Sequence, residues 1–345
     1  DGNAMSRTVT KPTQALIAKE LHLSRNTVSK VLNGNTLKVS TLTRDKILKA
    51  ADEMNYRPNM LARGLVNQHI NVLGIILPDI ANPFYSDMAR GMTDAALKRG
   101  YNAMINNTDS LHERELSSIK VMAEYNVGGI LLVGNFDTFE ANVERIKQFR
   151  VPYVTVECYR DGQDYCVYVD NFTGSYNAVN YLIERGHRRI AYISQDDIIN
   201  DLENDRTKGY MMALQDNGIE YDASLVEHGS GFIESGYQKA MQIIKRNGDV
   251  TAIACGSDLI AMGAMKAVKE CGYSVPEDIS LVGFDDVYFA TVTEPRLTTV
   301  RQPTYEMGVC GVNMLVDRIE KKEDALKRKC FQPRLIERDS VRTLR

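Results

Sequence analysis

Beyond about residue 70, the chain alternates between short apolar runs and longer stretches whose apolar residues recur every three or four positions. Runs such as LGIIL, GGILLVG and AIAC predict buried strands, because a strand covered on both faces needs apolar residues at every position. The longer stretches, such as MARGMTDAALK, have the spacing of amphipathic helices. The predicted strands are 72–77, 101–106, 129–133, 153–156, 167–169, 189–193, 225–227, 252–254, 280–283 and 298–301.

Helical patterns lie between many of these strands, at 88–98, 114–124, 177–185, 209–217, 237–246 and 260–271. Strands separated by helices of this length form βαβ units and parallel sheets. The number of units is too large for one sheet, so the pattern predicts two doubly wound α/β lobes. Crossings between the lobes are expected at 170–174 and at 294–303, where two prolines bracket a short extended run.

The chain up to about residue 57 has a purely helical pattern. Thr13 is expected to cap a first helix that ends near Leu21, and Ser24 to cap a second helix over 25–32 that stops at Asn33 and Gly34. A third helix is predicted over 43–55. Two short helices joined by a three-residue turn form a helix-turn-helix. The predicted fold class is therefore α/β, with an all-α helix-turn-helix head before two parallel-sheet lobes.

The second helix of a helix-turn-helix contacts base edges with its N-terminal residues. Arg25 and Asn26 occupy that leading edge, and Ser29 and Lys30 follow one turn later on the same side. Arginine and lysine prefer guanine and asparagine prefers adenine, each good pair contributing about 1–3 kcal/mol of discrimination. The alternative is an ordinary helical hairpin at the edge of a domain.

The segment YRPNMLARGLV follows the head. Pro58 can open a helix but cannot continue one, and residues 59–65 span only about two turns, too few for a helix that is stable alone in water. We interpret the segment as a hinge that becomes helical on DNA, with Leu65 as an apolar wedge in the minor groove. The alternative is a plain linker helix whose Leu65 packs on the body.

The charge of the chain is unevenly distributed. The net charge is only −3, but residues 1–69 hold eleven Lys and Arg against five Asp and Glu, and the remainder holds thirty-one against forty. A basic head on an acidic body is expected where only the head meets phosphate. No apolar stretch approaches the roughly 18–20 residues of a membrane span, no apolar signal core is present, and the six cysteines have no paired spacing. We therefore expect a cytoplasmic protein without membrane contact.

In a two-lobe α/β protein, ligands bind opposite the carboxyl ends of the strands. Arg206 and Asp258 follow such strands, and an arginine and an acid beside aromatic rings can hold a polyol through complementary hydrogen bonds. Structural alternatives remain open: an ion pair between Arg206 and Asp258, and core positions for Phe84 and Phe232. The predicted effector-binding residues are Phe84, Tyr85, Glu157, Arg206, Phe232 and Asp258.

Sequence signatures of enzymes are missing. No GxGxxG follows the first strand, and neither GxxxxGK[ST] nor GxSxG occurs. Asp285 and Asp286 follow a strand, as a catalytic pair would. The five histidines have no metal-ligand spacing, and His187 is interpreted as a turn residue. We expect no catalytic activity, no cofactor and no bound metal.

Several segments together resemble the LacI/GalR (lactose-repressor) family of bacterial transcription regulators. They are SRNTVSKVLNG, NYRPNMLARGL, LGIILPDIANPFY, DNFTGSYNA, LIERGHRRIAYI, SVPEDISLVGFDD and PRLTTVRQP, in family order over nearly the whole chain. The resemblance implies a periplasmic-binding-protein-like sensor, a homodimer, a pseudopalindromic double-stranded DNA operator and a small-molecule effector. It also makes Asp285 and Asp286 a structural loop.

The resemblance assigns roles to individual residues. It implies effector contacts by Arg206 and Asp258, in a pocket lined by Phe84, Tyr85 and Phe232. It implies base contacts by Arg25, Asn26 and Lys30, phosphate contacts by Thr13, Thr27, Asn33, Ser40, Thr43 and Tyr56, and hinge contacts by Asn59, Ala62 and Leu65, to which we add Ser24 and Ser29 from the helix-turn-helix pattern.

The chain also departs from the family pattern. Lys30 stands where arginine is usual and lacks its planar fork for guanine. Leu16 replaces a usual aspartate, and Leu21, His22 and Leu23 replace a usual Ala-Gly-Val turn. Histidine is among the non-glycine residues that tolerate positive φ, so the turn is expected to survive. These changes leave the operator sequence open.

The sequence thus predicts a homodimeric repressor that a sugar or sugar derivative releases from DNA. The runner-up is a purine-type corepressor, followed by a sugar-binding receptor or a sugar-modifying enzyme. No apolar heptad follows residue 336, which favours a dimer over a tetramer. The predicted domains are the helix-turn-helix at 5–57, the hinge at 58–69 and the effector-binding and dimerisation domain at 70–345, with an N-lobe of 70–169 and 299–326 and a C-lobe of 170–298 and 327–345.

Overall fold

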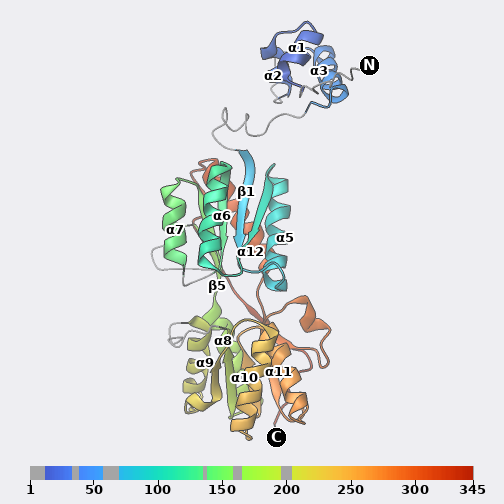
Figure 1. Cartoon of the computed structure of the whole chain (residues 1–345). Coiled ribbons are helices and arrows are strands. Elements are labelled where there is room, and N and C mark those ends of the chain that lie inside the picture. Colours follow the sequence, from blue (N-terminus) through green and yellow to red (C-terminus); the bar gives the residue numbers. More distant parts are fainter. Residues whose placement is uncertain are drawn as a thin grey trace, which may run out of the picture. The chain divides into compact units, whose positions relative to one another are not determined.

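A computed structural model describes residues 12–32, 39–56, 70–134, 138–157, 165–195 and 204–344. The chain divides into two compact units, residues 1–70 and 71–345. Figure 1 shows helices alone in the first unit and two helix-covered sheets in the second. The predicted fold class is confirmed.

The described residues of the first unit form three helices around a very small core. Its helices are α1 (Gln14–Glu20), α2 (Arg25–Leu32) and α3 (Thr41–Glu53). Each helix is apolar on one side only, so the three can bury their apolar stripes only against one another. The buried side chains at the centre are Ile17, Ala18, Val28, Val31, Ile47 and Ala51.

Hydroxyl side chains fix where these helices start. The Thr13 hydroxyl accepts from the amide of Leu16 at 3.3 Å, and the Ser24 hydroxyl accepts from the amide of Thr27 at 3.1 Å. Both predicted caps are confirmed. Ser40 caps α3 in the same way, so this helix begins at Thr41, two residues earlier than predicted.

The first sheet of the second unit has the strand order β11-β5-β4-β3-β1-β2. In chain order its strands are β1 (Ile70–Leu77), β2 (Asn102–Asn107), β3 (Val127–Val133), β4 (Tyr153–Val156), β5 (Cys166–Val169) and β11 (Arg328–Phe331). Helices α5 (Pro83–Lys98) and α12 (Thr304–Ile319) pack together on one face, and α6 (His112–Glu124) and α7 (Phe139–Gln148) on the other (Figure 1).

Alternate residues of these strands enter two separate cores. Ile75 and Leu131 pack with Met88 of α5 and Leu315 of α12. Their neighbours Ile76 and Ile130 face the opposite core, between the sheet and helices α6 and α7. Because side chains alternate across a strand, both faces demand apolar residues, which explains the continuous apolar runs in the sequence.

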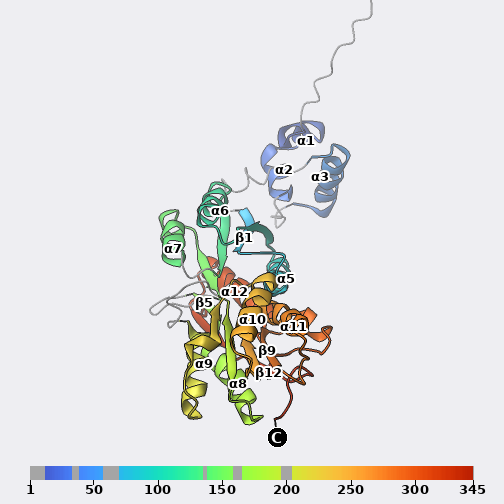
Figure 2. The same cartoon turned by 60° about the horizontal axis from the view of Figure 1, so that its bottom comes forward.

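The second sheet has the order β12-β10-β9-β8-β6-β7. In chain order its strands are β6 (Ile190–Ser194), β7 (Val226–His228), β8 (Ala252–Cys255), β9 (Ser280–Asp285), β10 (Thr298–Arg301) and the antiparallel β12 (Arg334–Ile336). The described part of this lobe also contains two short 3₁₀ helices, η2 (Ala223–Leu225) and η3 (Tyr288–Thr291). Helices α8 (Asn171–Glu184) and α9 (Asp205–Asp216) pack together on one face, and α10 (Ile233–Arg246) and α11 (Asp258–Glu270) on the other (Figure 2).

The chain crosses between the two lobes at residue 170, at 302–303 and at 332–333. Two lobe boundaries therefore differ from the predicted ones. Residues 299–301 belong to β10 in the second sheet, because this strand pairs with β9. Strand β11 belongs to the first sheet, beside β5. Its sequence, RKCF, is a half-exposed edge strand without an apolar run, so the pattern could not reveal it.

The C-terminal residues run across the second lobe and tie its segments together. The Ser340 hydroxyl donates to the carbonyl of Leu281 at 2.6 Å, and the amide of Leu344 donates to the carbonyl of Arg185 at 2.7 Å. His187 follows α8 in a loop, as predicted, but it is fully buried. Its ring nitrogens lie 3.0 Å from the Thr251 hydroxyl and 3.1 Å from the carbonyl of Arg342.

We predict that His187 makes the stability of the second unit sensitive to mild acid. Burial lowers the pKa of His187, so the folded state favours the neutral ring. The neutral His187 ring stabilises the fold fully above its unfolded pKa of about 6.5, and this stabilisation is lost as the pH falls through its folded pKa. When the pH is lowered from about 7.5 to about 5.5, the melting temperature of the native protein should fall more than that of His187→Gln. Equal falls would contradict this role.

Candidate functional sites

Helix α2 has an apolar face inside the first unit and a polar face outside it. Val28 and Val31 are buried in the three-helix core. Arg25, Asn26 and Lys30 are exposed. The predicted base-reading residues therefore share the face that is free of packing, which is the arrangement that a helix in the major groove requires.

Five of the other predicted DNA contacts lie at helix starts: Thr13, Ser24, Thr27, Ser40 and Thr43. The Thr27 and Thr43 hydroxyls lie 2.8 Å from those of Ser24 and Ser40, which cap α2 and α3. Amides at a helix start favour anions such as phosphate. His22, in the turn before α2, has the positive φ of 52° that the sequence leads one to expect. Predicted contacts Asn33, Asn59, Ala62 and Leu65 lie outside the described residues, whereas Thr13, Ser29 and Tyr56 lie inside them.

Arg206 is held rigidly at the carboxyl end of the second sheet. It lies in the first turn of α9 and is only 3% exposed. Its Nε donates to Asn171 Oδ1 at 2.8 Å, and its Nη1 donates to the carbonyl of Gly256 at 2.6 Å. The guanidinium also stacks over the Phe284 ring, 3.9 Å from its centroid. These contacts fix the direction in which the remaining donors point.

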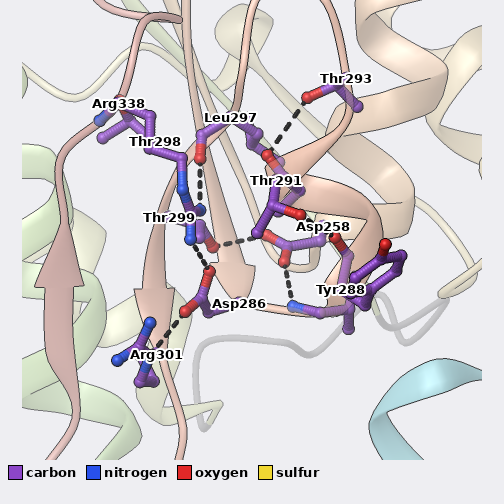
Figure 3. A network of polar contacts seen from close by, with 12 residues as sticks. Asp258, Asp286, Tyr288, Thr291, Thr293, Leu297, Thr298, Thr299, Arg301 and Arg338 are labelled. Atoms are coloured by element: carbon purple, nitrogen blue, oxygen red, sulfur yellow. Dashed lines mark hydrogen bonds and ion pairs between the residues drawn. The ribbon is translucent and has the colours of Figure 1, made fainter.

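Asp258, the first residue of α11, is fully buried. Its Oδ2 accepts from the amide of Val287 at 2.8 Å, and its Oδ1 accepts from the Thr299 hydroxyl (Figure 3). The ion pair of Arg206 is formed with Asp285 at 3.9 Å, so the ion pair with Asp258 that the sequence allowed is not the one observed.

The two buried aspartates have raised pKa values. Burial raises the pKa of Asp258 well above its ordinary value, and the charge of Asp285 raises it further. Burial raises the pKa of Asp285 to about 6, opposed by Arg206 and by the hydrogen bond from Gln302. Burying carboxylates is costly unless they are paired. Such a cost at the carboxyl ends of parallel strands is typical of a ligand site.

Asp286 is neutralised by two arginines. Its carboxylate accepts from Arg301 Nε at 2.6 Å and from Arg338 Nη2 at 2.5 Å (Figure 3). With Asp285 paired to Arg206 and Gln302, both carboxylates of the predicted loop are engaged by the protein itself. This agrees with the structural interpretation of the pair.

Three segments of the first lobe converge at the carboxyl end of its sheet. A Cβ added to Gly134, after β3, would lie 3.2 Å from Glu157 Oε2 and 3.5 Å from the Tyr85 hydroxyl. Glu157 follows β4 with a φ of 74° and is mostly buried. Phe84 is buried in the first-lobe core, which is the structural alternative for this residue. Phe232 precedes α10 and is 58% exposed.

A cavity of about 480 Å³ lies between α5 and the loop after β9. Its lining comes from both lobes and includes Phe84, Asp87 and Arg90 on one side and Asp286 and Tyr288 on the other. The sequence pattern does not reveal Asp87, Arg90 or the residues that hold Arg206. Their positions depend on how the sheets pack, for which the sequence has no local signal.

Comparisons with known proteins agree with this architecture. Residues 17–59 match the family described as bacterial regulatory proteins, lacI family, and residues 179–341 match a periplasmic binding protein-like domain. The HTH-type transcriptional regulator RegA of Clostridium saccharobutylicum is 36% identical over 326 residues, which cover 94% of this chain and 98% of the relative.

Two solved structures are similar over nearly the whole chain. The complex of the transcriptional regulator CelR with cellobiose has 30% identity and a TM-score of 0.71, covering 95% of this chain and 99% of the other. The lac repressor dimer bound to operator and the anti-inducer ONPF has a TM-score of 0.86 and covers 96% and 100%. Its 24% identity supports the fold alone.

A helix-turn-helix unit in one chain with a two-lobe α/β domain defines a DNA-binding regulator with a ligand-binding body. The chain belongs to the lacI family of bacterial regulatory proteins. The family resemblance noted in the sequence is thereby confirmed, and the relatives are transcription regulators rather than enzymes.

We predict that Asp258→Asn raises the melting temperature at about pH 7.5. Because the pKa of Asp258 is raised in the folded state, its carboxyl group stabilises the fold fully only below the unfolded pKa of about 3.8. That stabilisation is lost as the pH rises through the folded pKa, so the ionised carboxylate destabilises the fold at neutral pH. The amide oxygen can accept from Val287, and the amide nitrogen can donate to Thr299. The advantage of the variant should shrink toward about pH 4.5. A lower melting temperature at both values would mean that the carboxylate is structural.

Proposed function

We propose that this chain is a homodimeric, allosteric transcription repressor that binds a pseudopalindromic operator and is released by a sugar or sugar derivative. The observation that carries the DNA-binding part is the polar face of α2, where Arg25, Asn26 and Lys30 are exposed opposite the buried Val28 and Val31. A dimer presents two such helices to two half-sites about one helical turn apart, which explains the expected operator symmetry.

Each class of predicted DNA contact has a physical rationale. Arg25, Asn26 and Lys30 are proposed to read bases, with Ser29 beside them. The hydroxyls at the helix starts, with Tyr56, are proposed to position the unit on phosphates. The proposed positioning residues are Thr13, Ser24, Thr27, Asn33, Ser40, Thr43 and Tyr56, and the proposed hinge contacts are Asn59, Ala62 and Leu65.

The proposed effector is a polyol. Arg206 has hydrogen-bond donors fixed in direction, and Asp258 and Glu157 have carboxylate acceptors at the carboxyl ends of their sheets. Sugars offer hydroxyls that can both donate and accept, so they match such a set. Tyr85 and the exposed Phe232 are available to stack on the C–H face of a ring. The cellobiose complex of the similar regulator CelR supports this class.

The lining of the cavity supports a sugar over a purine corepressor. Besides Phe84, it includes the charged or hydroxyl side chains of Asp87, Arg90, Asp286 and Thr304, which suit a ligand rich in hydroxyls. A receptor or an enzyme would leave the base-reading face of α2 without a role. A DNA target also supports the proposed cytoplasmic location. Separately, none of the helices that the structure describes is long and apolar enough to cross a membrane.

A thermal-shift screen tests the effector proposal. The protein is melted with cellobiose, other sugars, sugar phosphates, nucleosides and purine bases, because a ligand that binds only the folded state stabilises it by mass action. We predict that a sugar at about 100 times its Kd stabilises the native protein by about 2.7 kcal/mol. Asp258→Ala should abolish the shift.

The control for this screen is Asp249→Ala. Asp249 forms an exposed ion pair with Arg189 in the same lobe, so its loss should leave the sugar response intact. A shift with purine bases instead of sugars would contradict the proposed effector class. An unchanged sugar response in Asp258→Ala would return Asp258 to a purely structural role.

A second prediction concerns the hinge, which lies outside the described residues. Leu65→Ala should weaken binding to operator DNA roughly tenfold, because an inserted apolar wedge contributes to the bent complex. Binding can be followed by fluorescence anisotropy on DNA that the native protein selects from a random pool. Effector affinity should not change, and Leu97→Ala, at an exposed position on α5, should bind DNA normally. Native affinity in Leu65→Ala would rule out the wedge.

A further inference from the structure

Five cations lie close together in the sequence of the second unit, whose charge is otherwise negative. The segment 321–329, KKEDALKRK, holds Lys321, Lys322, Lys327, Arg328 and Lys329 against two acids. Residues 70–345 hold thirty-one Lys and Arg against forty Asp and Glu, so twenty-six remain against thirty-eight outside this segment, here called the basic strip. All five cations are exposed. The basic strip therefore reverses the charge of the second unit locally.

The basic strip lies at the end of the first sheet that is farther from the second lobe. Strand β11 ends at the crossing at 332–333, and α5, which follows β1, lines the cavity between the lobes. Both strands therefore end toward the second lobe and begin at the opposite end, which holds the basic strip and Ile70, the first residue of β1. The chain arrives at Ile70 from the helix-turn-helix unit, so residues 57–69 tether any DNA that this unit binds to the same end of the sheet.

Local structure explains only part of the basic strip. Lys322 lies 2.7 Å from Asp317 and 3.1 Å from Glu320, two acids that also bind Arg99. Strand β11 pairs with β5 alone, and lysines on an edge strand discourage pairing with another sheet. The helix dipole favours a cation after α12, yet Lys321 has a φ of 54°, a conformation for which glycine is favoured at a helix end. A function that needs positive charge accounts for the whole strip.

Strand β11 arranges its cations as an extended row. The carbonyl of Lys327 accepts from the amide of Cys166 at 3.1 Å, so the pairing with β5 includes this residue. Side chains alternate across a strand, so Lys327 and Lys329 share one face, about 7 Å apart, and Arg328 lies on the other. The Lys329 ammonium lies over the Phe331 ring, 5.3 Å from its centroid. An exposed row of this kind suits a partner with regularly spaced negative charges.

We propose that the basic strip contacts the phosphates of duplex DNA that flanks the operator. The proposal rests on the proposed binding of operator DNA by the helix-turn-helix unit. Phosphate contacts by lysine and arginine need no base sequence and gain affinity from the release of counterions. Because residues 57–69 tether the strip to the operator-bound unit, the contact is intramolecular, so even a weak one raises the affinity. An acidic protein would match the charge as well, but it would lack this tether.

The length of the DNA tests the proposal. The operator is selected from a random pool by the native protein and is prepared alone and with about 15 base pairs, roughly one and a half helical turns, added on each side. Fluorescence anisotropy gives both affinities. At about 50 mM salt the native protein should bind the long duplex about fivefold more tightly than the short one, and at about 200 mM salt the difference should vanish. Equal affinities for the two duplexes at low salt would overturn the proposal.

The strip variant combines Lys321→Gln, Lys327→Gln and Lys329→Gln in the full chain. These side chains are exposed, so the melting temperature should stay near that of the native protein. The variant should bind the short duplex within about twofold of native but lose the preference for the long one. With the long duplex, the slope of log K against log salt should weaken by about 2 to 3, or roughly 0.9 for each lost phosphate contact. A strip variant that keeps the native preference would refute the proposal.

The matched control removes the same charge from the second lobe. It combines Lys208→Gln, Lys245→Gln and Lys269→Gln, at three exposed positions on α9, α10 and α11. This variant should keep the native preference for the long duplex. Arginine at the three positions of the strip variant should keep it as well, because a phosphate contact needs the positive charge. A control that loses the preference to the same extent would show an effect of net charge alone and would count against the strip.

A duplex of random sequence separates this proposal from the proposed function. A native protein that enriches no operator from the pool would count against the proposed function. The strip variant and its control are then compared on a random-sequence duplex of about 40 base pairs at low salt, where lost phosphate contacts still weaken binding. Weaker binding by the strip variant alone supports the proposal. Equal affinities overturn it and assign the basic strip to protection of the β11 edge or to an acidic protein partner.

Discussion

The buried carboxylate of Asp258 is the constraint on which the lobe boundary depends. A charge without solvent is costly, and this one is stabilised by the Thr299 hydroxyl and the Val287 amide. Those two bonds join α11 to β10 and to the loop after β9. The close approach also explains Gly283, where a Cβ would lie 2.3 Å from Asp258 Oδ1. Asp258 therefore raises the free energy of the folded state, and yet its hydrogen bonds fix the loop after β9.

The two units handle their polar groups in opposite ways. The first unit has a very small core and keeps its polar residues at the surface, so α2 has a complete face available for DNA. The second unit has four large cores, on both faces of two sheets, and buries its functional charges at the sheet ends. Large cores allow that burial, because many apolar contacts offset the unfavourable free energy of burying a few charges. DNA reading and ligand sensing thus have different physical requirements.

Much of this could be predicted from the sequence. Apolar runs located the buried strands, and hydroxyl residues before helical patterns located the caps of α1 and α2. Arg206 and Asp258 were selected because they follow strands, and their role as effector contacts stays a prediction. The sequence could not reveal that Arg206 pairs with Asp285, since that contact depends on left-handed φ values at the end of β9. The edge strand β11 was missed, and the core position of Phe84 was only one of two open alternatives, for a similar reason: pairing and packing partners far along the chain decide both.

The most direct test of an effector-controlled DNA regulator is reciprocity between the two sites. Calorimetric titration of cellobiose, or of another sugar that stabilises the protein, into free and DNA-bound chain gives two dissociation constants. Thermodynamic linkage requires that their ratio equal the factor by which the same sugar changes DNA affinity. We predict weaker sugar binding to the DNA complex, by that factor. The same sugar affinity with and without DNA would contradict the account.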